Sequence, residues 1–388
     1  MIFYILNLLV VRALSASTVN SQTIPIISPV TETIAENPAK NADADDMAIY
    51  VHPENLDSSF AIAAFKKGGL GVYDLTGKEI QSITPKNIRY NNVDIAYGVE
   101  SPSQIAGEVS TIDLAIASDR KNDTIAIFGI NPNGGGLTGE RNLGAKSNSN
   151  SFLRDVTSAN IPTSIFGVDD GEATAYGLAA YTSVADDKSY VFVSQSDGNK
   201  IAQLELKPEI GAADEFTVNA EIISIFEVPI PPGLEIEDAL VEGMVVDNET
   251  EMLYLAQENF GIWKTQANPN SDRKLTLVDK VKDYQQDSPL RADIEGLTIY
   301  YEGNGNGYLM DSRQGDSTFA ISDRRGNNRY LGSFSIEGVN KTGGLDVVDA
   351  PLGEQYPLWL LIVQDWVNQG QPNFKYLTMA DILSKFRN

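Results

Sequence analysis

The chain has 388 residues, of which 42% are hydrophobic, so it can bury a large core and is not globally disordered. Its 53 acidic residues outnumber its 29 basic residues and give a net charge of −24, which leaves no basic surplus for neutralising the phosphates of a nucleic acid. It contains no cysteine, which excludes disulfides, thiolate nucleophiles and cysteine-ligated zinc or iron–sulfur sites, and its single histidine is His52.

The first residues predict an export signal. An apolar run over residues 2–11 is followed by small residues at 13–17, and the run is too short to span a membrane. We therefore expect a signal peptide over residues 1–18, a secreted or periplasmic protein and no membrane insertion. A buried first strand is the alternative, because no Lys or Arg precedes the apolar run. Residues 19–41, rich in Thr, Pro and Ala, are predicted to be a lead-in segment to one domain over residues 42–388.

Six similar strand beginnings recur along that domain. They read ADDMAIYV, NNVDIAYGV, AYGLAAYTS, VEGMVVD, IEGLTIYY and GGLDVVD. Each places one residue at the head of an apolar strand, and these residues are Asp45, Asn92, Tyr176, Glu242, Glu295 and Gly343. The positions are spaced by about 60 residues on average, which suits a propeller blade with insertions.

A second series of six segments lies one strand later in each repeat. They read FAIAAFKKGGLGVYDL, IDLAIASDRKNDTIAIFGI, YVFVSQSDGNKIAQLEL, MLYLAQENFGIWKT, GYLMDSRQGDSTFAISDR and LWLLIVQDWVNQGQPNFKYL. Apolar runs bounded by Gly, Asn and Asp are typical of strands. A short helix is predicted only near residues 379–386. The sequence therefore predicts an all-β, single-domain, six-bladed β-propeller; an array of immunoglobulin-like domains would repeat at about 100 residues.

Equivalent residues of successive blades lie on a ring, so polar groups at the strand ends should meet at one mouth. The oxygen donors at these positions are Asp45, Asp46, Glu242, Glu258, Asp293, Glu295 and Gln314. Carboxylates this close together need a counter-charge, and Ca²⁺ accepts several of them in flexible geometry. Taken singly, each acid could instead be a solvated loop residue.

Basic residues occupy the same positions in the first two blades, at Lys66, Lys67 and Arg120. A rim that is acidic and metal-binding on one side and basic on the other suits a polyanion, and phosphate esters are the best candidates.

Several segments resemble one family. DADDMAIYVHP, NNVDIAYG, VEGMVVD, DIEGLTIYY and SRQGDSTFAISDR are similar to the β-propeller phytases, calcium-dependent alkaline phytases of bacteria, and GLDVV with VQDW and QPNFK extends the resemblance over residues 41–378. It implies a 3-phytase-type phosphomonoesterase that acts on phytate, myo-inositol hexakisphosphate, bound as a calcium complex. It also implies several calcium ions, and we expect a monomer.

The resemblance assigns roles by position. The implied catalytic residues are Glu242, Asp293, Glu295, Lys66 and Arg120. The implied substrate-binding residues are Lys66, Lys67, Arg120, Tyr176, Ser317 and Arg324. The implied calcium ligands are Asp45, Asp46, Glu242, Glu258, Asp293, Glu295, Gln314 and Asp346. His52 has no matched role, and we expect it to be structural.

Two positions depart from the family pattern. Gly343 stands where the family usually has an acidic residue, so one calcium ligand is missing there unless Asp346 or a water replaces it. Ser196 and Asp197 stand where the family often has a lysine, and Lys200 lies beyond an insertion.

The expected reaction is metal-assisted attack of water on a phosphomonoester, without a phosphorylated enzyme. Lys66 and Arg120 would stabilise charge on the transferred group. A non-catalytic or weakly active calcium- and phosphate-binding propeller remains an alternative, as does a calcium-dependent propeller lactonase or esterase. The basic residues favour phosphate over the lactonase or esterase.

Overall fold

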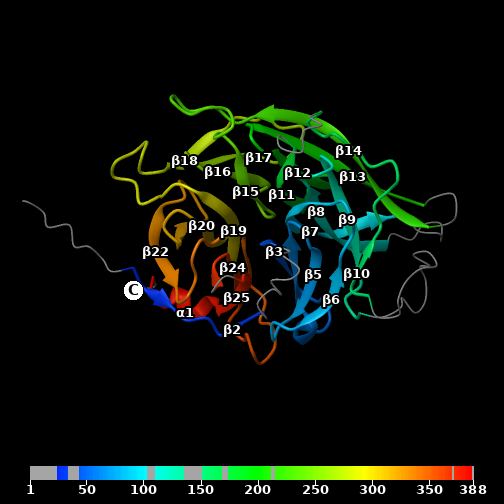
Figure 1. Ribbon diagram of the computed structural model, residues 1–388, viewed down its shortest axis with the longest axis horizontal. Coiled ribbons are helices and arrows are strands. Elements are labelled where there is room, and N and C mark those ends of the chain that lie inside the picture. Colours follow the sequence, from blue (N-terminus) through cyan, green and yellow to red (C-terminus); the bar gives the residue numbers. More distant parts are fainter. Residues whose placement is uncertain are drawn as a thin grey trace, which may run out of the picture.

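The computed structural model describes residues 24–33, 43–102, 110–134, 151–167, 174–210, 215–368 and 371–386. They form six sheets around a central axis, antiparallel except for one short outer strand (Figure 1). The predicted six-bladed propeller is confirmed. The predicted signal peptide over residues 1–18 lies outside the described residues. Within them, no helix has the length and apolar character needed to cross a membrane.

Each blade runs from the axis outward in chain order. Blade 1 comprises β3 (Ala44–Tyr50), β4 (Phe60–Phe65), β5 (Gly69–Asp74) and β6 (Glu79–Ile83). Blade 2 comprises β7 (Tyr90–Ser101), β8 (Ser110–Asp119), β9 (Thr124–Ile130) and β10 (Leu153–Asp155). Blade 3 comprises β11 (Ala175–Thr182), β12 (Ser189–Gln195), β13 (Lys200–Ile210) and β14 (Phe216–Glu227).

The remaining blades repeat this order. Blade 4 comprises β15 (Val241–Asp247), β16 (Met252–Gln257), β17 (Gly261–Gln266) and β18 (Thr276–Lys280). Blade 5 comprises β19 (Ile294–Gly303), β20 (Asn306–Arg313), β21 (Thr318–Asp323) and β22 (Tyr330–Ile336). Blade 6 contains β23 (Leu345–Val348), β24 (Leu360–Asp365) and β25 (Asn373–Thr378), and the helix α1 (Met379–Leu383) follows.

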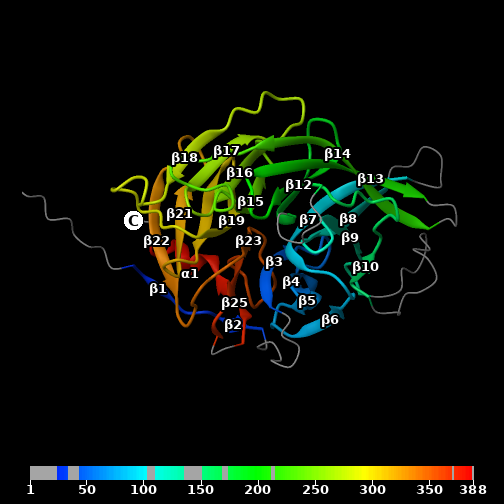
Figure 2. The ribbon, with the colours of Figure 1, turned by 45° about the horizontal axis from the view of Figure 1, so that its top comes forward.

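The beginning of the described chain closes the propeller. β2 (Thr31–Glu32) pairs with β25 as the outer strand of blade 6, and β1 (Ile26–Ile27) runs parallel to β22 of blade 5. Figure 2 shows both short strands against these outer edges. Lys375 pairs with Glu32, and Thr33 Oγ1 accepts the backbone N–H of Phe374 at 3.0 Å. Part of the segment predicted as a lead-in to the domain over residues 42–388 therefore supplies short strands to two blades.

The strands are apolar because neighbouring blades cover both faces of each sheet. Every residue of β4 and β12 is buried, so these strands read as continuous apolar runs rather than as alternating ones. The core lies between blades: Val93 of blade 2, for example, packs in one cluster with Ile62 and Val72 of blade 1. Burial on both faces explains why continuous apolar runs, more than alternation, marked the repeats in the sequence.

Five of the six inner strands carry a β-bulge at their first residues. The ladder register shifts between Ala44 and Asp46, Tyr90 and Val93, Ala175 and Leu178, Val241 and Met244, and Ile294 and Gly296. A bulge bends a strand and redirects the side chains at that point. The fold thus turns one residue of each of these strands toward the axis at the same end of the propeller.

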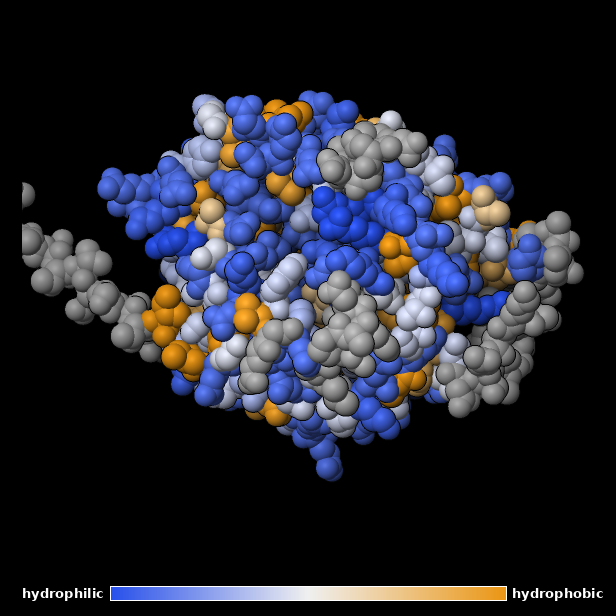
Figure 3. Space-filling model, in the orientation of Figure 1, coloured by the Kyte–Doolittle hydropathy of each residue, from blue (hydrophilic) through white to orange (hydrophobic). Residues whose placement is uncertain are grey.

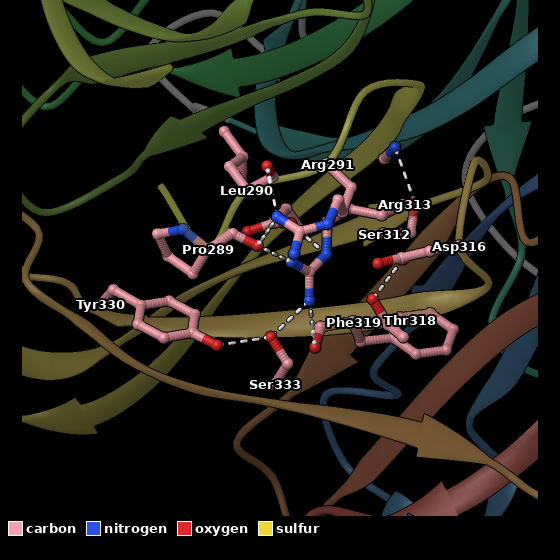
Figure 4. Close-up of polar contacts among 12 residues, drawn as sticks. Pro289, Leu290, Arg291, Ser312, Arg313, Asp316, Thr318, Phe319, Tyr330 and Ser333 are labelled. Atoms are coloured by element: carbon pink, nitrogen blue, oxygen red, sulfur yellow. Dashed lines mark hydrogen bonds and ion pairs between the residues drawn. The ribbon is translucent and has the colours of Figure 1, made fainter. Parts of the chain in front are cut away.

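Arg313 fixes the segment that leads into blade 5 (Figure 4). Its guanidinium donates to the backbone oxygens of Pro289 at 2.8 Å and Phe319 at 3.2 Å and to Ser333 Oγ at 2.5 Å. Its Nε lies 3.7 Å from Asp311 Oδ1, and both side chains are almost fully buried. Arg291 donates to the backbone oxygens of three consecutive residues that end at Leu290. Two arginines therefore hold the link between blades 4 and 5.

We expect Arg313→Met to lower the free energy of unfolding by about 3–5 kcal/mol at neutral pH, because it leaves Asp311 and two carbonyl oxygens buried without this partner. Urea unfolding measures the change. Arg329→Met is the control, since Arg329 forms an exposed pair with Asp323 that is worth at most about 1 kcal/mol. Equal small losses in the two variants would contradict a structural role for Arg313.

Candidate functional site

Two rings of side chains surround one end of the axis. In every blade, the residue after the second strand donates its backbone N–H to a carbonyl oxygen just ahead of the inner strand, over 2.8–3.3 Å. These six donors define the outer ring: Lys66, Arg120, Ser196, Glu258, Gln314 and Trp366. The residues two positions after the six acceptors define the inner ring: Asp45, Asn91, Tyr176, Glu242, Glu295 and Gly343.

The structure changes one residue in the series of six strand beginnings that the sequence predicted. Asn92 was expected at the head of β7, but the position belongs to Asn91, whose Nδ2 donates to Glu242 Oε1 across the ring at 3.0 Å. Asn92 instead donates to Asp46 Oδ2 at 3.1 Å. The bulge at this point lets either of two adjacent asparagines match the pattern, so sequence spacing could not separate them.

Glu242 is the centre of the inner ring's hydrogen bonds. Besides the bond from Asn91, it accepts a bond from the hydroxyl of Tyr176 at 2.8 Å. The same hydroxyl lies 3.4 Å from Glu258 Oε1. Tyr176 was predicted to bind substrate, and its hydroxyl here links two carboxylates. The bonds from Asn91 and Tyr176 fix the orientation of Glu242.

Glu258, Asp293 and Glu295 form an acidic trio in which one carboxylate oxygen from each lies within 4.8 Å of the others. Burial raises the pKa of Glu258 and Glu295 well above the ordinary value, and the charge of Glu242 raises both further. The pKa of Asp293 is raised by the same two causes. Asp293 has a φ of 66°, a left-handed conformation that is uncommon for a residue with a side chain.

The residues at this mouth fit a hard divalent cation. The trio offers only oxygen atoms, and both burial and the nearby charge of Glu242 oppose the ionisation of Glu258 and Glu295. Across the ring, Asp45 Oδ2 is buried without a hydrogen-bond partner. Oxygen-only donor sets of flexible geometry suit Ca²⁺.

Blades 1 and 2 contribute cationic side chains to the same mouth. Lys66 Nζ lies 2.5 Å from Asp45 Oδ1 and 5.1 Å from the centre of the Trp366 ring. Although burial favours neutral lysine, the carboxylates of Asp45 and Glu242 outweigh it and hold the pKa of Lys66 above its usual range. The guanidinium of Arg120 lies 5.1 Å above the ring of Tyr176. The mouth thus carries fixed positive and negative groups side by side.

Three other predicted site residues lie outside both the inner ring and the acidic trio. Lys67 is exposed, with Nζ 4.0 Å from Asp43. Ser317 stays near the mouth, where its hydroxyl accepts the backbone N–H of Lys341 at 3.0 Å. Gln314 belongs to the outer ring.

Arg324 is not brought to the mouth. It follows β21, which starts at the mouth and ends at the opposite end of blade 5, and it is buried there in pairs with Asp247 at 2.6 Å and Glu249 at 2.8 Å. Its predicted contact with substrate does not fit this position, because its charge is already matched within the fold.

Asp46 and Asp346, two predicted calcium ligands, line a cavity of about 50 Å³ that all six inner strands surround. Asp46 accepts the backbone N–H of Val93 at 3.1 Å, and Asp346 accepts that of Ile49 at 2.8 Å. Asp94 lines the same cavity and accepts the N–H of Ala180 at 2.8 Å. In each case a carboxylate on one inner strand bonds to the backbone of the next, so these acids join blades.

Sequence reasoning missed two residues at the mouth. Trp366 occupies the outer ring in blade 6, and Arg89 supplies the carbonyl that accepts the N–H of Arg120. Aligning the second series of segments residue by residue would have placed Trp366 beside Lys66 and Arg120. Arg89 lies outside both series, in the loop before β7, and had no such signal.

The face seen in Figure 3 is mainly hydrophilic, and its hydrophobic residues lie in small separate groups. Outside the grey residues, this face shows no single broad apolar area.

Comparison with known proteins places this arrangement in context. The chain matches the family model described as Phytase over residues 2–387. It is 33% identical over 389 residues to a protein named 3-phytase from Bacillus subtilis (strain 168), and the match covers 96% of this chain and 89% of that protein.

Similar solved structures are distant. One is a protein of unknown function from Bacteroides thetaiotaomicron, with a TM-score of 0.47 and 11% identity over 91% of this chain and 74% of that chain. Another is the β-propeller domain of Cps50 (Swd1) from Myceliophteria thermophila, with a TM-score of 0.43 and 11% identity over 85% of this chain and 82% of that chain.

The buried acids predict an unusual pH dependence of stability in a chelator. Burial raises the pKa of Asp45 and of Asp94 from 3.8 to about 7. Between these values the folded protein keeps protons that the unfolded chain has released, so the free energy of unfolding should fall as pH rises from about 4 to about 7. Urea unfolding at several pH values in a chelator, with and without excess calcium, measures this. Stability that rises across the interval in the chelator would contradict it.

Proposed function

The chain belongs to the phytase family, and from this premise we propose that it hydrolyses phytate to phosphate and lower inositol phosphates in a calcium-dependent reaction at the two rings. The observation that carries the proposal is that the acidic trio, Lys66 and Arg120 all lie at one mouth. A cation held by the trio and the two basic side chains together would face one polyanionic substrate. The relative from Bacillus subtilis, named 3-phytase, supports the same activity.

The protein's own charge requires cations between it and its substrate. With a net charge of −24, the chain repels a polyanion at long range. We therefore propose that phytate binds as a calcium complex and that calcium is the resident ion. Glu258, Asp293 and Glu295 would hold it, with Glu242 and Gln314 nearest to them in the rings. When bound, calcium would offset the carboxylate charge and polarise phosphoryl oxygens.

The chain's own residues have separate tasks in this reaction. Lys66 and Arg120 stabilise charge that develops on the transferred phosphoryl oxygens. Water adds to phosphorus, the bond from phosphorus to the ester oxygen breaks, and the alcohol leaves with a proton. Glu242, which lies outside the trio that would hold calcium, can accept the proton that water releases. Asn91 and Tyr176 keep Glu242 oriented for this role.

We extend the proposal to the protein's environment. The apolar and small-residue pattern over residues 1–18 supports export, so we propose a secreted or periplasmic enzyme that acts as a monomer. The lack of cysteine means that its stability in such a compartment comes from metal binding and packing rather than from disulfides.

Calcium should control both activity and stability. In a chelator we expect phosphate release from phytate to fall to background and the melting temperature to drop. Without a bound cation, the carboxylates at the mouth repel one another. Restoring calcium should recover both. Phosphate assays and thermal unfolding on the same samples measure the two effects. A protein whose activity and melting temperature ignore the chelator does not have a calcium site here.

Replacing Glu295 tests the position of the reaction centre. Glu295→Gln should reduce kcat by at least about 100-fold with the fold retained, because it removes a charged oxygen from the trio. Phosphate release and the melting temperature are measured for the variant.

Glu54→Gln is the matched control, since Glu54 is an exposed acid beyond the far end of β3. It should leave turnover unchanged. Similar turnover in the two variants would show that the reaction takes place elsewhere.

A further inference from the structure

Trp366 and Lys66 meet where the propeller closes. Trp366 follows β24 of blade 6, Lys66 follows β4 of blade 1, and both belong to the outer ring. Lys66 Nζ lies 5.1 Å from the centre of the Trp366 ring, within the range of a cation–π contact. The contact therefore joins the last blade to the first at the mouth.

Two buried side chains of blade 6 fix the segment that carries Trp366. Gln364 Nε2 donates to the backbone oxygen of Ala44 in blade 1 at 3.0 Å, so the end of β24 is tied to the neighbouring blade. Asp365 is fully buried, and its Oδ1 accepts the backbone N–H of Asn368 at 3.2 Å across the turn. The turn thus presents the ring from a fixed backbone at the seam between the two blades.

The ammonium group of Lys66 has two partners of different kinds. Asp45 Oδ1 lies 2.5 Å from Nζ, and within the part of the chain that the structure describes Asp45 is the one carboxylate within 4.0 Å of this nitrogen. An ammonium has three N–H donors, and the bond to Asp45 uses one of them. The Trp366 ring attracts the positive charge through its π face rather than through a lone pair. The pair of partners therefore leaves N–H groups of Lys66 available for the oxygens of a phosphoryl group.

We propose that Trp366 is a positioning residue for transfer of the phosphoryl group to water, and that it acts through Lys66. A lysine stem is flexible, so one ion pair with Asp45 would leave the ammonium several positions. The ring restricts the ammonium to one of them, so that its charge is already in place when negative charge develops on the phosphoryl oxygens. The inference rests on the proposed phytase function.

Replacing the ring tests this role. We expect Trp366→Leu to lower kcat for phytate about tenfold and to change KM by less than about twofold, because the ring acts on the position of a charge rather than on substrate binding. Trp366→Phe should lose only about threefold, since phenylalanine keeps a weaker cation–π face. In a Lys66→Met background, Trp366→Leu should lower kcat no further, because the group that the ring positions is already gone.

Trp359→Leu is the matched control. Trp359 precedes β24 at the other end of blade 6, is half-buried like Trp366, and packs edge-on against Tyr300. Its replacement should lower the melting temperature and leave kcat unchanged. An unchanged kcat in Trp366→Leu, or the same loss with and without Lys66, would overturn the inference while leaving the phytase function standing.

Urea unfolding gives a readout that does not depend on turnover. The cation–π contact predicts that Trp366→Leu lowers the equilibrium constant for folding about fivefold more in the wild-type background than in Lys66→Met. A wild-type protein that releases no phosphate from phytate would overturn the proposed function, and this comparison would still decide whether the ring holds Lys66. If Trp366→Leu fails to fold, Trp366→Phe takes its place, and equal losses of kcat in the two backgrounds would overturn the positioning role.

Discussion

Unneutralised negative charge at the mouth is the constraint on which the candidate site depends. Glu258, Asp293 and Glu295 converge within 4.8 Å, and burial together with the charge of Glu242 opposes their ionisation. Such a group of acids costs stability unless protons or a cation offset it. The acidic trio bears this cost at the end of the axis where the mouth meets solvent. At the other acids of the axis, such as Asp46 and Asp346, backbone N–H groups of the next blade bond to the carboxylates. Acidic residues therefore have two roles along the axis. In the cavity they join neighbouring blades through hydrogen bonds, and at the mouth they concentrate negative charge.

Repetition of one local geometry produces the convergence. Each blade ends its second strand with an N–H bonded to the carbonyl that precedes the inner strand, and five inner strands bulge immediately afterwards. The backbone is therefore nearly the same in all six blades, while the side chains differ from blade to blade. Lys66 and Glu258 occupy equivalent outer-ring positions with opposite charge. A symmetric scaffold can in this way build an asymmetric site, acidic on blades 4 and 5 and basic on blades 1 and 2.

The sequence was sufficient for the repeat, the fold and most of the mouth, because apolar strands and polar strand ends are local signals. It was less informative where a contact depends on distant parts of the chain. The pairing of β2 with β25 joins residues more than 300 positions apart, and a two-residue strand has no periodicity to detect. Arg324 lies in a segment that resembles the family, yet its partners Asp247 and Glu249 come from the neighbouring blade. Residue type alone could not show that its charge was already satisfied.

Gly343 illustrates how packing decides what a departure from a pattern means. A glycine there could reflect a left-handed backbone, but its φ is not positive, so conformation does not require it. A Cβ would instead meet Asp45 O and Gln364 Oε1 at 3.2 Å, which is close contact on both sides. Asp346 does not replace the missing carboxylate, because its oxygens bond to Ile49, Thr298 and Val347 inside the cavity. Blade 6 therefore contributes to the mouth chiefly through Trp366, whose ring lies against Lys66 and limits the positions that this lysine can reach.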